Sequence, residues 1–206
     1  YEVFGNTFPV LVKFIDADDD LSIQVHPDDD YAFENEDSLG KTEMWYVMDS
    51  EPHASIIRGW KQPMSAPLIN EAIKRGDLSD YLLEYQVHSG DVVMLPAGIV
   101  HAMKRGTIVA EIQENSDITY RLYDYKRKDK DGSERELHIE KGIIASNLTP
   151  VTDFYEKGVK DGCELKLVSC PFFNVSRIEL DGIAEINVDP SSFAALTVTE
   201  GEGRIV

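Results

Sequence analysis

Four polar side chains in three separate segments have the chemistry of a divalent-metal site: Gln24, His26, Glu43 and His101. Imidazole nitrogen together with amide and carboxylate oxygen suits Zn²⁺ or another first-row dication. The set lacks the thiolates that are typical of a structural zinc site. Four such ligands, with water completing the coordination shell, would therefore make a site of the catalytic type.

The first two of these residues lie in a strictly alternating segment, 21–27. Side chains two positions apart on a strand share one face, so Gln24 and His26 are expected to point one way. Ile23 and Val25 are expected to point the other way. Taken alone, a Gln-x-His pair is more often the exposed polar face of a strand, and that interpretation stays open here.

The other two residues lie where strands begin or bend. Glu43 opens the apolar run 43–49, where a carboxylate that faces the interior needs a partner. The run 91–95 ends in a Pro-x-Gly bend, and His101 lies just past it. A metal shared by the three segments would supply the partner that Glu43 needs.

Most of the chain has the rhythm of a β protein. Gly, Pro, Asn and Asp recur every eight to twelve residues, which favours an antiparallel sandwich or barrel over alternating strands and helices. The strands expected between these breaks are 8–15, 21–26, 43–49, 54–58, 84–87, 91–95, 107–113 and 118–123.

One stretch, about 67–85, interrupts this rhythm. Its apolar residues recur at helical spacing up to Gly76, a residue type that often ends helices. Asp77 then opens a pattern that predicts a short second helix carrying Leu82 and Leu83. The sequence thus predicts a small helical insertion in an all-β fold.

The composition excludes several classes of protein. With 38 acidic and 20 basic residues, the net charge is −18, which argues against a nucleic-acid partner. Hydrophobic residues make up 42% of the chain, enough for a packed core. The longest apolar run, 92–100, is too short to span a bilayer, so no membrane partner is expected. Two cysteines make no disulfide framework, which favours the cytoplasm.

The two ends suggest a longer protein. The chain begins without Met close to an alternating run and ends in residues typical of a strand, a turn and the start of another strand. A strand that never pairs leaves its backbone groups unsatisfied. We therefore expect a metal-binding domain at 1–145, a connector at 146–170 and the truncated beginning of a second domain at 171–206. A complete protein with a C-terminal edge strand is the alternative.

Two motifs resemble those of cupins, which are jelly-roll β-barrels. The segment Gly90-x5-Pro96-x-Gly98-x2-His101 resembles the second cupin motif. The pair Gln24-x-His26, followed by Glu43, resembles the first motif, with Gln in place of its first His. The resemblance implies a cupin barrel, and it implies that 171–206 opens a second, cupin-like domain.

Three longer segments narrow the resemblance to type I mannose-6-phosphate isomerases in their shorter bacterial form: Ser22–Asp29, Gly40–Tyr46 and Glu111–Asp124. The similarity covers about residues 8–145. It implies a zinc enzyme, with Co²⁺ or Mn²⁺ as substitutes, that interconverts mannose 6-phosphate and fructose 6-phosphate. It also implies that the metal is held by the four residues named first. The only partner implied is a small phosphosugar, and a homodimer is compatible with the family.

The same resemblance points to two catalytic residues. Arg121 lies in a segment similar to the family's active-site arginine segment, and its permanent charge suits the stabilisation of negative substrate oxygens. A surface Arg paired with Asp117 or Asp124 is the alternative. Lys41 shares the face of Glu43, and the family implicates such a lysine in acid–base or substrate-oxygen contacts. Longer members carry a His just before it, where this chain has Gly40.

The sequence does not decide which group removes the C–H proton. The candidates are Glu111, Glu114, Asp117 and a metal-bound hydroxide. A hydride shift, which is the alternative mechanism, would need no base. For the substrate phosphate, the local positive charge after Arg121 suggests Lys126 and Arg127, with Asp117 nearby, although solvated loop residues are an equal alternative.

Two other functions are compatible with the ligand set. Two His and a Glu also suit the non-haem Fe(II) of a cupin dioxygenase, although Gln24 and the Arg121 segment speak against it. A non-catalytic sugar-binding cupin is the second alternative.

Overall fold

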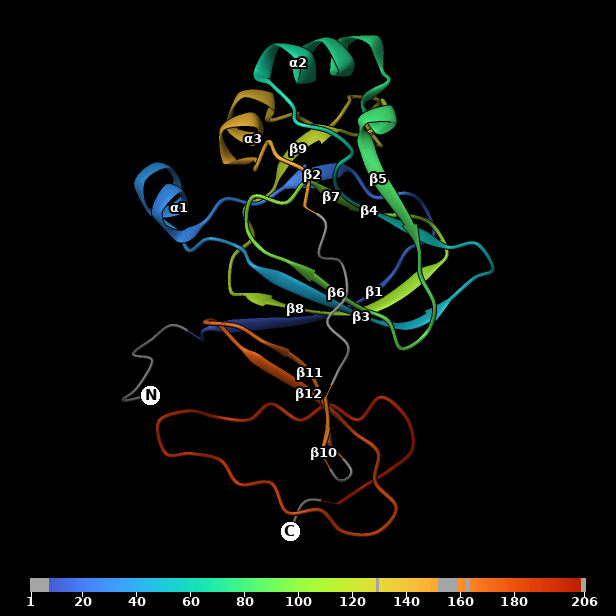
Figure 1. The fold of residues 1–206 in the computed structure, drawn as a ribbon, viewed down its shortest axis with the longest axis vertical. Coiled ribbons are helices and arrows are strands. Elements are labelled where there is room, and N and C mark those ends of the chain that lie inside the picture. Colours follow the sequence, from blue (N-terminus) through green and yellow to red (C-terminus); the bar gives the residue numbers. More distant parts are fainter. Residues whose placement is uncertain (1–7, 129, 152–158, 162–163, 205–206) are drawn as a thin grey trace.

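Two antiparallel sheets face each other in the computed structural model, which describes residues 8–128, 130–151, 159–161 and 164–204 (Figure 1). The first sheet has four strands in the order β1 (Val10–Asp16), β8 (Thr107–Glu114), β3 (Glu43–Ser50) and β6 (Val92–Leu95). The second has five strands in the order β5 (Leu82–Gln86), β4 (Ser55–Trp60), β7 (His101–Met103), β2 (Ile23–Val25) and β9 (Tyr120–Tyr123). The predicted mostly-β fold is confirmed.

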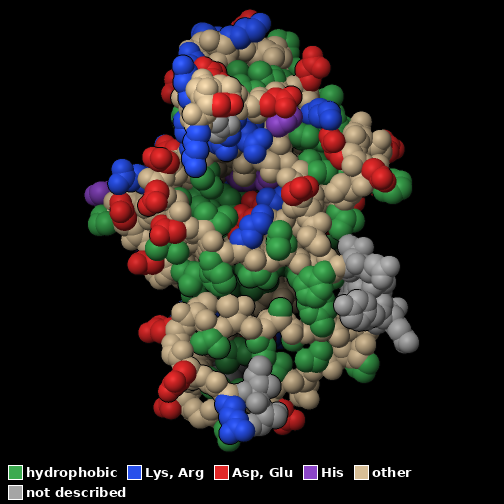
Figure 2. Space-filling view, turned by 180° about the vertical axis from the view of Figure 1, so that it is seen from behind, with side chains coloured by type: hydrophobic (Ala, Val, Ile, Leu, Met, Phe, Trp, Pro, Cys, Tyr) green, Lys and Arg blue, Asp and Glu red, His purple; other side chains and the backbone are tan. Residues whose placement is uncertain are grey.

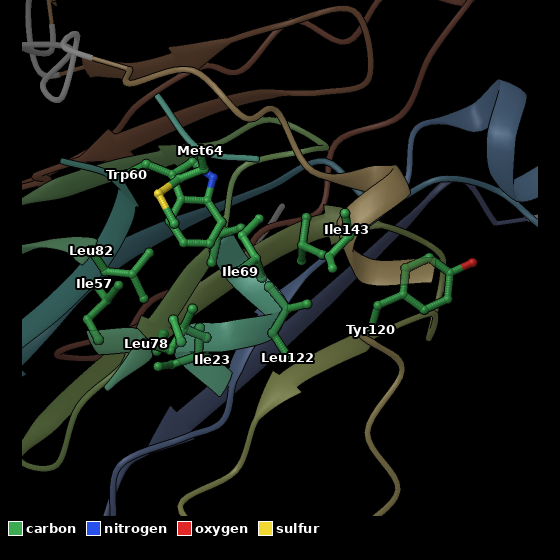
Figure 3. Close-up of a cluster of buried hydrophobic side chains, with 14 residues drawn as sticks. Ile23, Ile57, Trp60, Met64, Ile69, Leu78, Leu82, Tyr120, Leu122 and Ile143 are labelled. Carbon is green, nitrogen blue, oxygen red and sulfur yellow. The ribbon is translucent and has the colours of Figure 1, made fainter. Parts of the chain in front are cut away.

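Helices cover the outer face of the five-stranded sheet (Figure 1). They are α2 (Ala66–Arg75), the 3₁₀ helix Leu78–Tyr81 and α3 (Ile139–Ala145). A buried cluster joins them to the sheet, with Ile69, Leu78 and Ile143 packed on Ile23 and Leu122 (Figure 3). Because Ile23 faces this cluster, its strand neighbour Gln24 is turned toward the space between the sheets.

The helical insertion differs from the prediction in its second half. Helix α2 ends at Gly76, whose φ of 81° is the left-handed C-cap that the sequence suggested. The expected second helix is only the 3₁₀ helix Leu78–Tyr81, and the assignment of Leu82 and Leu83 to that helix was wrong. Both lie in β5, because Leu82 pairs with Trp60 of β4 and is buried in the core.

Two further helices were not predicted. Helix α1 (Asp29–Glu36) follows β2, and its N-cap is Asp28, whose carboxylate accepts a hydrogen bond from the Tyr31 N–H. Helix α3 begins at Ile139, after the last of the expected strands. None of the described helices has the length and apolar character that crossing a bilayer requires.

A third sheet of three strands lies against the outer face of the four-stranded sheet (Figure 1). Its strands are β10 (Val159–Asp161), β11 (Glu164–Ser169) and β12 (Asn174–Ile178). Leu167 and Phe173 pack on Met44 of β3. The described residues 179–204 contain no helix or strand, and a second domain over 171–206 stays a prediction.

Candidate metal centre

Strand pairing places two of the four candidate ligands side by side in the second sheet, and a third, His26, directly follows β2. Gln24 of β2 lies opposite His101 of β7, and on its other side it lies opposite Arg121 of β9. Ile23 and Val25 are fully buried against the helices, so that Gln24 and His26 project from the other face of the sheet. His26 is only 1% exposed. The interpretation of this pair as an exposed polar face is therefore wrong.

Glu43, the first residue of β3, reaches the two imidazoles from the facing sheet. Its Oε1 lies 3.3 Å from His101 Nε2, and its Oε2 lies 3.6 Å from His26 Nε2. One ligand atom from each of the three residues lies within 4.8 Å of the others, and all three residues are buried. Within the described part of the chain, no other group of three or more His, Cys, Asp or Glu has this geometry.

Backbone carbonyls orient both imidazoles toward Glu43. His26 Nδ1 lies 2.8 Å from the Ile118 carbonyl oxygen, and His101 Nδ1 lies 2.8 Å from that of Ile99. A carbonyl can only accept, so each Nδ1 carries the proton and each Nε2 keeps a lone pair for a metal. Burial lowers the pKa of His26 well below 6.5, which favours the neutral imidazole that metal binding requires.

Glu43 keeps its negative charge in this buried place. Burial raises the pKa of its carboxyl, but nearby positive charge, including that of the Lys41 ammonium, outweighs burial and lowers the pKa below 4.5. Among residues 8–128, 130–151, 159–161 and 164–204, neither carboxylate oxygen finds a donor for a hydrogen bond of normal geometry. An ionised, buried carboxylate without directed hydrogen bonds fits a metal ligand, because a dication would supply the interaction that it lacks.

Gln24 stands at the edge of this group. Its Nε2 lies 3.4 Å from His101 Nε2, and its Oε1 accepts a hydrogen bond from the Ser22 hydroxyl. Ligation through Oε1 would require the amide to turn over. Such a turn exchanges two groups of nearly equal size, so the position of Gln24 is compatible with a fourth ligand.

Lys41 shares the face of Glu43, as expected. Its Nζ lies 2.7 Å from Glu43 Oε2 and 3.2 Å from His26 Nε2. The lysine side chain is buried as well. Its ammonium is therefore held directly beside two of the candidate ligands.

A second lysine, which the sequence analysis missed, comes from β1. Lys13 Nζ donates to Glu111 Oε1 at 3.1 Å and to Gln113 Oε1 at 2.5 Å. Glu111 Oε2 accepts from the Trp45 indole N–H at 3.0 Å, and its Oε1 lies 3.8 Å from Lys41 Nζ. The signal was present in the sequence, because Lys13 interrupts the apolar strand with one polar residue on the inner face.

Arg121 lies in β9 beside Gln24, and its buried Nε has no hydrogen-bond partner in the part of the chain that the structure describes. The alternative of a surface pair with Asp124 is not supported, because that carboxylate is taken by Arg127 and Arg135. Among the candidates for the phosphate, Asp117 and Lys126 are exposed. Arg127 also donates to the Asp20 carbonyl, so none of the three has a described contact with the His26–Glu43–His101 group.

The space-filling view shows Lys and Arg side chains around a hollow on one face of the molecule, with histidine and acidic side chains visible inside it (Figure 2). Positive charge therefore gathers locally on a chain whose net charge is −18. Such a surface attracts small anionic ligands.

Comparisons with known proteins find similarity to mannose-6-phosphate isomerases. A family model described as the catalytic domain of type I phosphomannose isomerase matches residues 1–54. The chain is 40% identical over 206 residues to mannose-6-phosphate isomerase ManA of Bacillus subtilis, covering 98% of this chain and 65% of the relative. It is 39% identical over 215 residues to mannose-6-phosphate isomerase of Streptococcus mutans, covering 99% and 66%.

A solved structure agrees with these relatives. The crystal structure of mannose 6-phosphate isomerase from Bacillus subtilis superimposes with a TM-score of 0.79 at 39% identity, covering 88% of this chain and 60% of that one. The chain thus spans about 65% of the length of the curated relatives that it matches.

Proposed function

Because the chain belongs to the type I phosphomannose isomerase family, we propose that it carries the site of a metal-dependent isomerase that interconverts mannose 6-phosphate and fructose 6-phosphate. One observation carries this proposal more than any other. Two imidazoles, one from the residue that directly follows β2 and one from β7, meet an ionised carboxylate of β3 within 4.8 Å, beside a buried lysine. The family relationship then supplies the substrate class that such a site would act on.

We propose that the ion is Zn²⁺, with Co²⁺ or Mn²⁺ as substitutes, and that Gln24, His26, Glu43 and His101 hold it. The donor set of nitrogen and oxygen atoms supports this choice, since all four groups are ligands that first-row dications accept. When bound, the ion supplies a Lewis acid for the oxygens on C1 and C2 of the sugar.

The reaction moves a proton from C2 to C1 of the sugar through an enediol, while negative charge develops on the two neighbouring oxygens. Lys41 and Arg121 are the cations proposed to stabilise that charge. Arg121 stays protonated at any working pH, which suits electrostatic stabilisation. Its Nε has no hydrogen-bond partner among the described residues that would compete with a substrate oxygen. Burial of the surrounding groups strengthens such interactions, because little water screens them.

Glu111 is the carboxylate that we propose for proton transfer. Its side chain is buried and faces Lys41, whereas the Glu114 carboxylate is bonded to the backbone of Thr42 and Asp117 is exposed. For the phosphate, we propose the positive groups that follow β9, Lys126 and Arg127, and we propose Asp117 as a further substrate-binding residue. The charge of that segment is their support.

The proposal is tested by a coupled assay on purified protein with fructose 6-phosphate, together with elemental analysis and oxygen uptake. Turnover to mannose 6-phosphate with zinc as the bound metal is the expected result. Iron with oxygen uptake and no isomerisation would favour the dioxygenase. Binding of the sugar phosphate to the metal-loaded protein without turnover would favour the sugar-binding alternative.

A further inference from the structure

Two acidic residues outside the metal centre hold the short segment 40–42, which carries Lys41. The Thr42 N–H donates to Glu114 Oε2 at 2.6 Å, and the Gly40 N–H donates to Asp29 Oδ1 at 2.8 Å. The N–H of Lys41 itself donates to the Pro27 carbonyl at 3.0 Å. All three backbone donors of the segment are therefore fixed from outside it.

Both carboxylates bind the backbone of the segment that carries Lys41, and neither has a described contact with the proposed metal ligands. Glu111 and Gln113 share the inner face of β8, and strand alternation turns Glu114 to the other face. Glu114 is 4% exposed, so its hydrogen bond to Thr42 is protected from water. The backbone N–H of Glu114 also donates to the Thr42 carbonyl at 3.0 Å. Glu114 thus forms hydrogen bonds with the backbone of Thr42 through both its side chain and its own backbone.

Helix α1 closes the other side of the segment. A Cβ atom placed on Gly40 would lie 2.5 Å from the Asp28 carbonyl carbon and 2.5 Å from the Asp29 nitrogen, which is closer than real atoms approach. The segment therefore touches the start of α1 directly. With β8 on one side and α1 on the other, it has little room to shift.

We propose that Glu114, assisted by Asp29, is a positioning residue that sets the Lys41 ammonium beside Glu43 for the isomerisation. The kinetic part of this inference rests on the proposed function. A shift of about 1 Å in a catalytic group costs on the order of 10²-fold in rate, so a loosened segment should reduce kcat. Substrate affinity should change less, because the proposed contacts of the phosphate lie elsewhere.

The protonation of Glu114 decides which substitution preserves its contacts. Burial, and then the nearby Asp29 carboxyl, raise its pKa from 4.5 to about 7. Near neutral pH, both forms of Glu114 are therefore populated, and the protonated form can accept from the Thr42 N–H with one oxygen and donate with the other. Gln offers the same pair of functions, so Glu114→Gln should keep the segment in place, whereas Glu114→Ala should release it.

A double-mutant cycle tests the inference through activity. Glu114→Ala should lower kcat by about 10-fold or more with a smaller change in KM, and Glu114→Gln should restore most of the loss. In a Lys41→Met background, Glu114→Ala should cause no further loss, because the effect passes through Lys41. Glu34→Ala, an exposed acidic residue of α1, is the control. Multiplicative losses in the double variant would overturn the inference.

Amide hydrogen exchange tests it without any turnover. In Glu114→Ala, exchange should accelerate at residues 40–42 and stay unchanged in β2 and β7, whereas Glu114→Gln should behave as wild type. Unchanged exchange at 40–42, or equal acceleration throughout the chain, would overturn the inference. If Glu114→Ala does not fold, Asp29→Ala enters the same cycle and the same exchange measurement. An inactive wild type would refute the proposed function, whereas an active wild type with normal Glu114→Ala kinetics would refute only the positioning role.

Discussion

Lys41 and Glu43 form a buried ion pair, with 2.7 Å between Nζ and Oε2 and side chains that are 6% and 0% exposed. The two residues lie two positions apart at the start of β3, so one extended stretch of backbone delivers both to the same face. The pair joins the proposed acid–base or oxygen-binding group directly to a proposed metal ligand. The Lys41 ammonium also compensates the negative charge of Glu43, whose side chain is buried away from solvent.

This relationship predicts how a loss of Lys41 affects stability. Removing one partner of a buried pair costs about 3–5 kcal/mol, because the other charge is left uncompensated. Lys41→Met should therefore lower the free energy of unfolding by about this amount in chelator, as measured by urea denaturation. Added Zn²⁺ should restore much of the loss, since the ion would take over the role of partner for Glu43. Equal losses with and without metal would contradict this, and Lys74→Met on the exposed face of α2 is the control.

Removing a ligand should remove the metal. His101→Ala is expected to abolish both zinc binding and turnover, since His101 Nε2 lies 3.3 Å from Glu43 and its Nδ1 is fixed by the Ile99 carbonyl. Metal content after dialysis, measured by elemental analysis, and the coupled isomerase assay are the readouts. His88→Ala, whose side chain is 79% exposed, should keep both. Full zinc occupancy with normal activity in His101→Ala would show that the ligand assignment is wrong.

Arg121 should matter for the rate and not for the metal. Arg121→Ala is expected to keep stoichiometric zinc but to lower kcat by about 10²-fold or more, on the scale of a lost oxyanion donor. The structural reason for this expectation is the buried Nε of Arg121, which no described residue engages in a hydrogen bond. Arg75→Ala in α2, an exposed arginine paired with Asp77, should leave kcat unchanged. A normal rate in Arg121→Ala would reduce Arg121 to a structural residue.

Glu114 should make stability depend on pH. Its pKa is raised from 4.5 to about 7 in the folded protein, by burial first and then by Asp29. Between pH 4.5 and about 7, the folded protein binds more protons than the unfolded chain. The stability that Glu114 contributes through its proton is therefore fully present below pH 4.5. It falls as the pH rises and levels off above about pH 7.

Glu114→Gln does not titrate, so its stability relative to wild type should rise with pH across that window, by about 1–3 kcal/mol. Urea denaturation at several pH values in the same metal-free buffer measures this difference. Glu34→Gln on α1 should show no such trend. A Glu114→Gln difference that is constant with pH would contradict the expectation.

Local pattern was enough to predict part of the site. The alternation around Gln24 and His26 determined which way they point, and the spacing from Lys41 to Glu43 placed both on one face. The meeting of His26, Glu43 and His101, with Gln24 at the edge, was different, because it depends on β2 pairing with β7 and on β3 facing them from the other sheet. Such pairings follow from the whole fold and not from any single segment, so only the family resemblance led to them.

The failures have physical causes that are equally specific. Lys13 was passed over because a lysine in an apolar strand usually faces solvent, and its inward direction follows from its pairing with Glu111. Leu82 was given to a helix because its local context looks helical, yet pairing with Trp60 and burial in the core determined its structure. The capping residue Asp28 and the acidic first turn after it did signal helix α1, and this signal was not used.

The central claim is that one divalent ion, held by Gln24, His26, Glu43 and His101, is needed to isomerise a phosphosugar. Its most direct measurement is the turnover of fructose 6-phosphate by the purified protein before chelation, after chelation, and after Zn²⁺, Co²⁺ or Mn²⁺ is added back. The account predicts that chelation abolishes turnover and that one equivalent of Zn²⁺ restores it. Full turnover in protein shown by elemental analysis to be free of metal would contradict it.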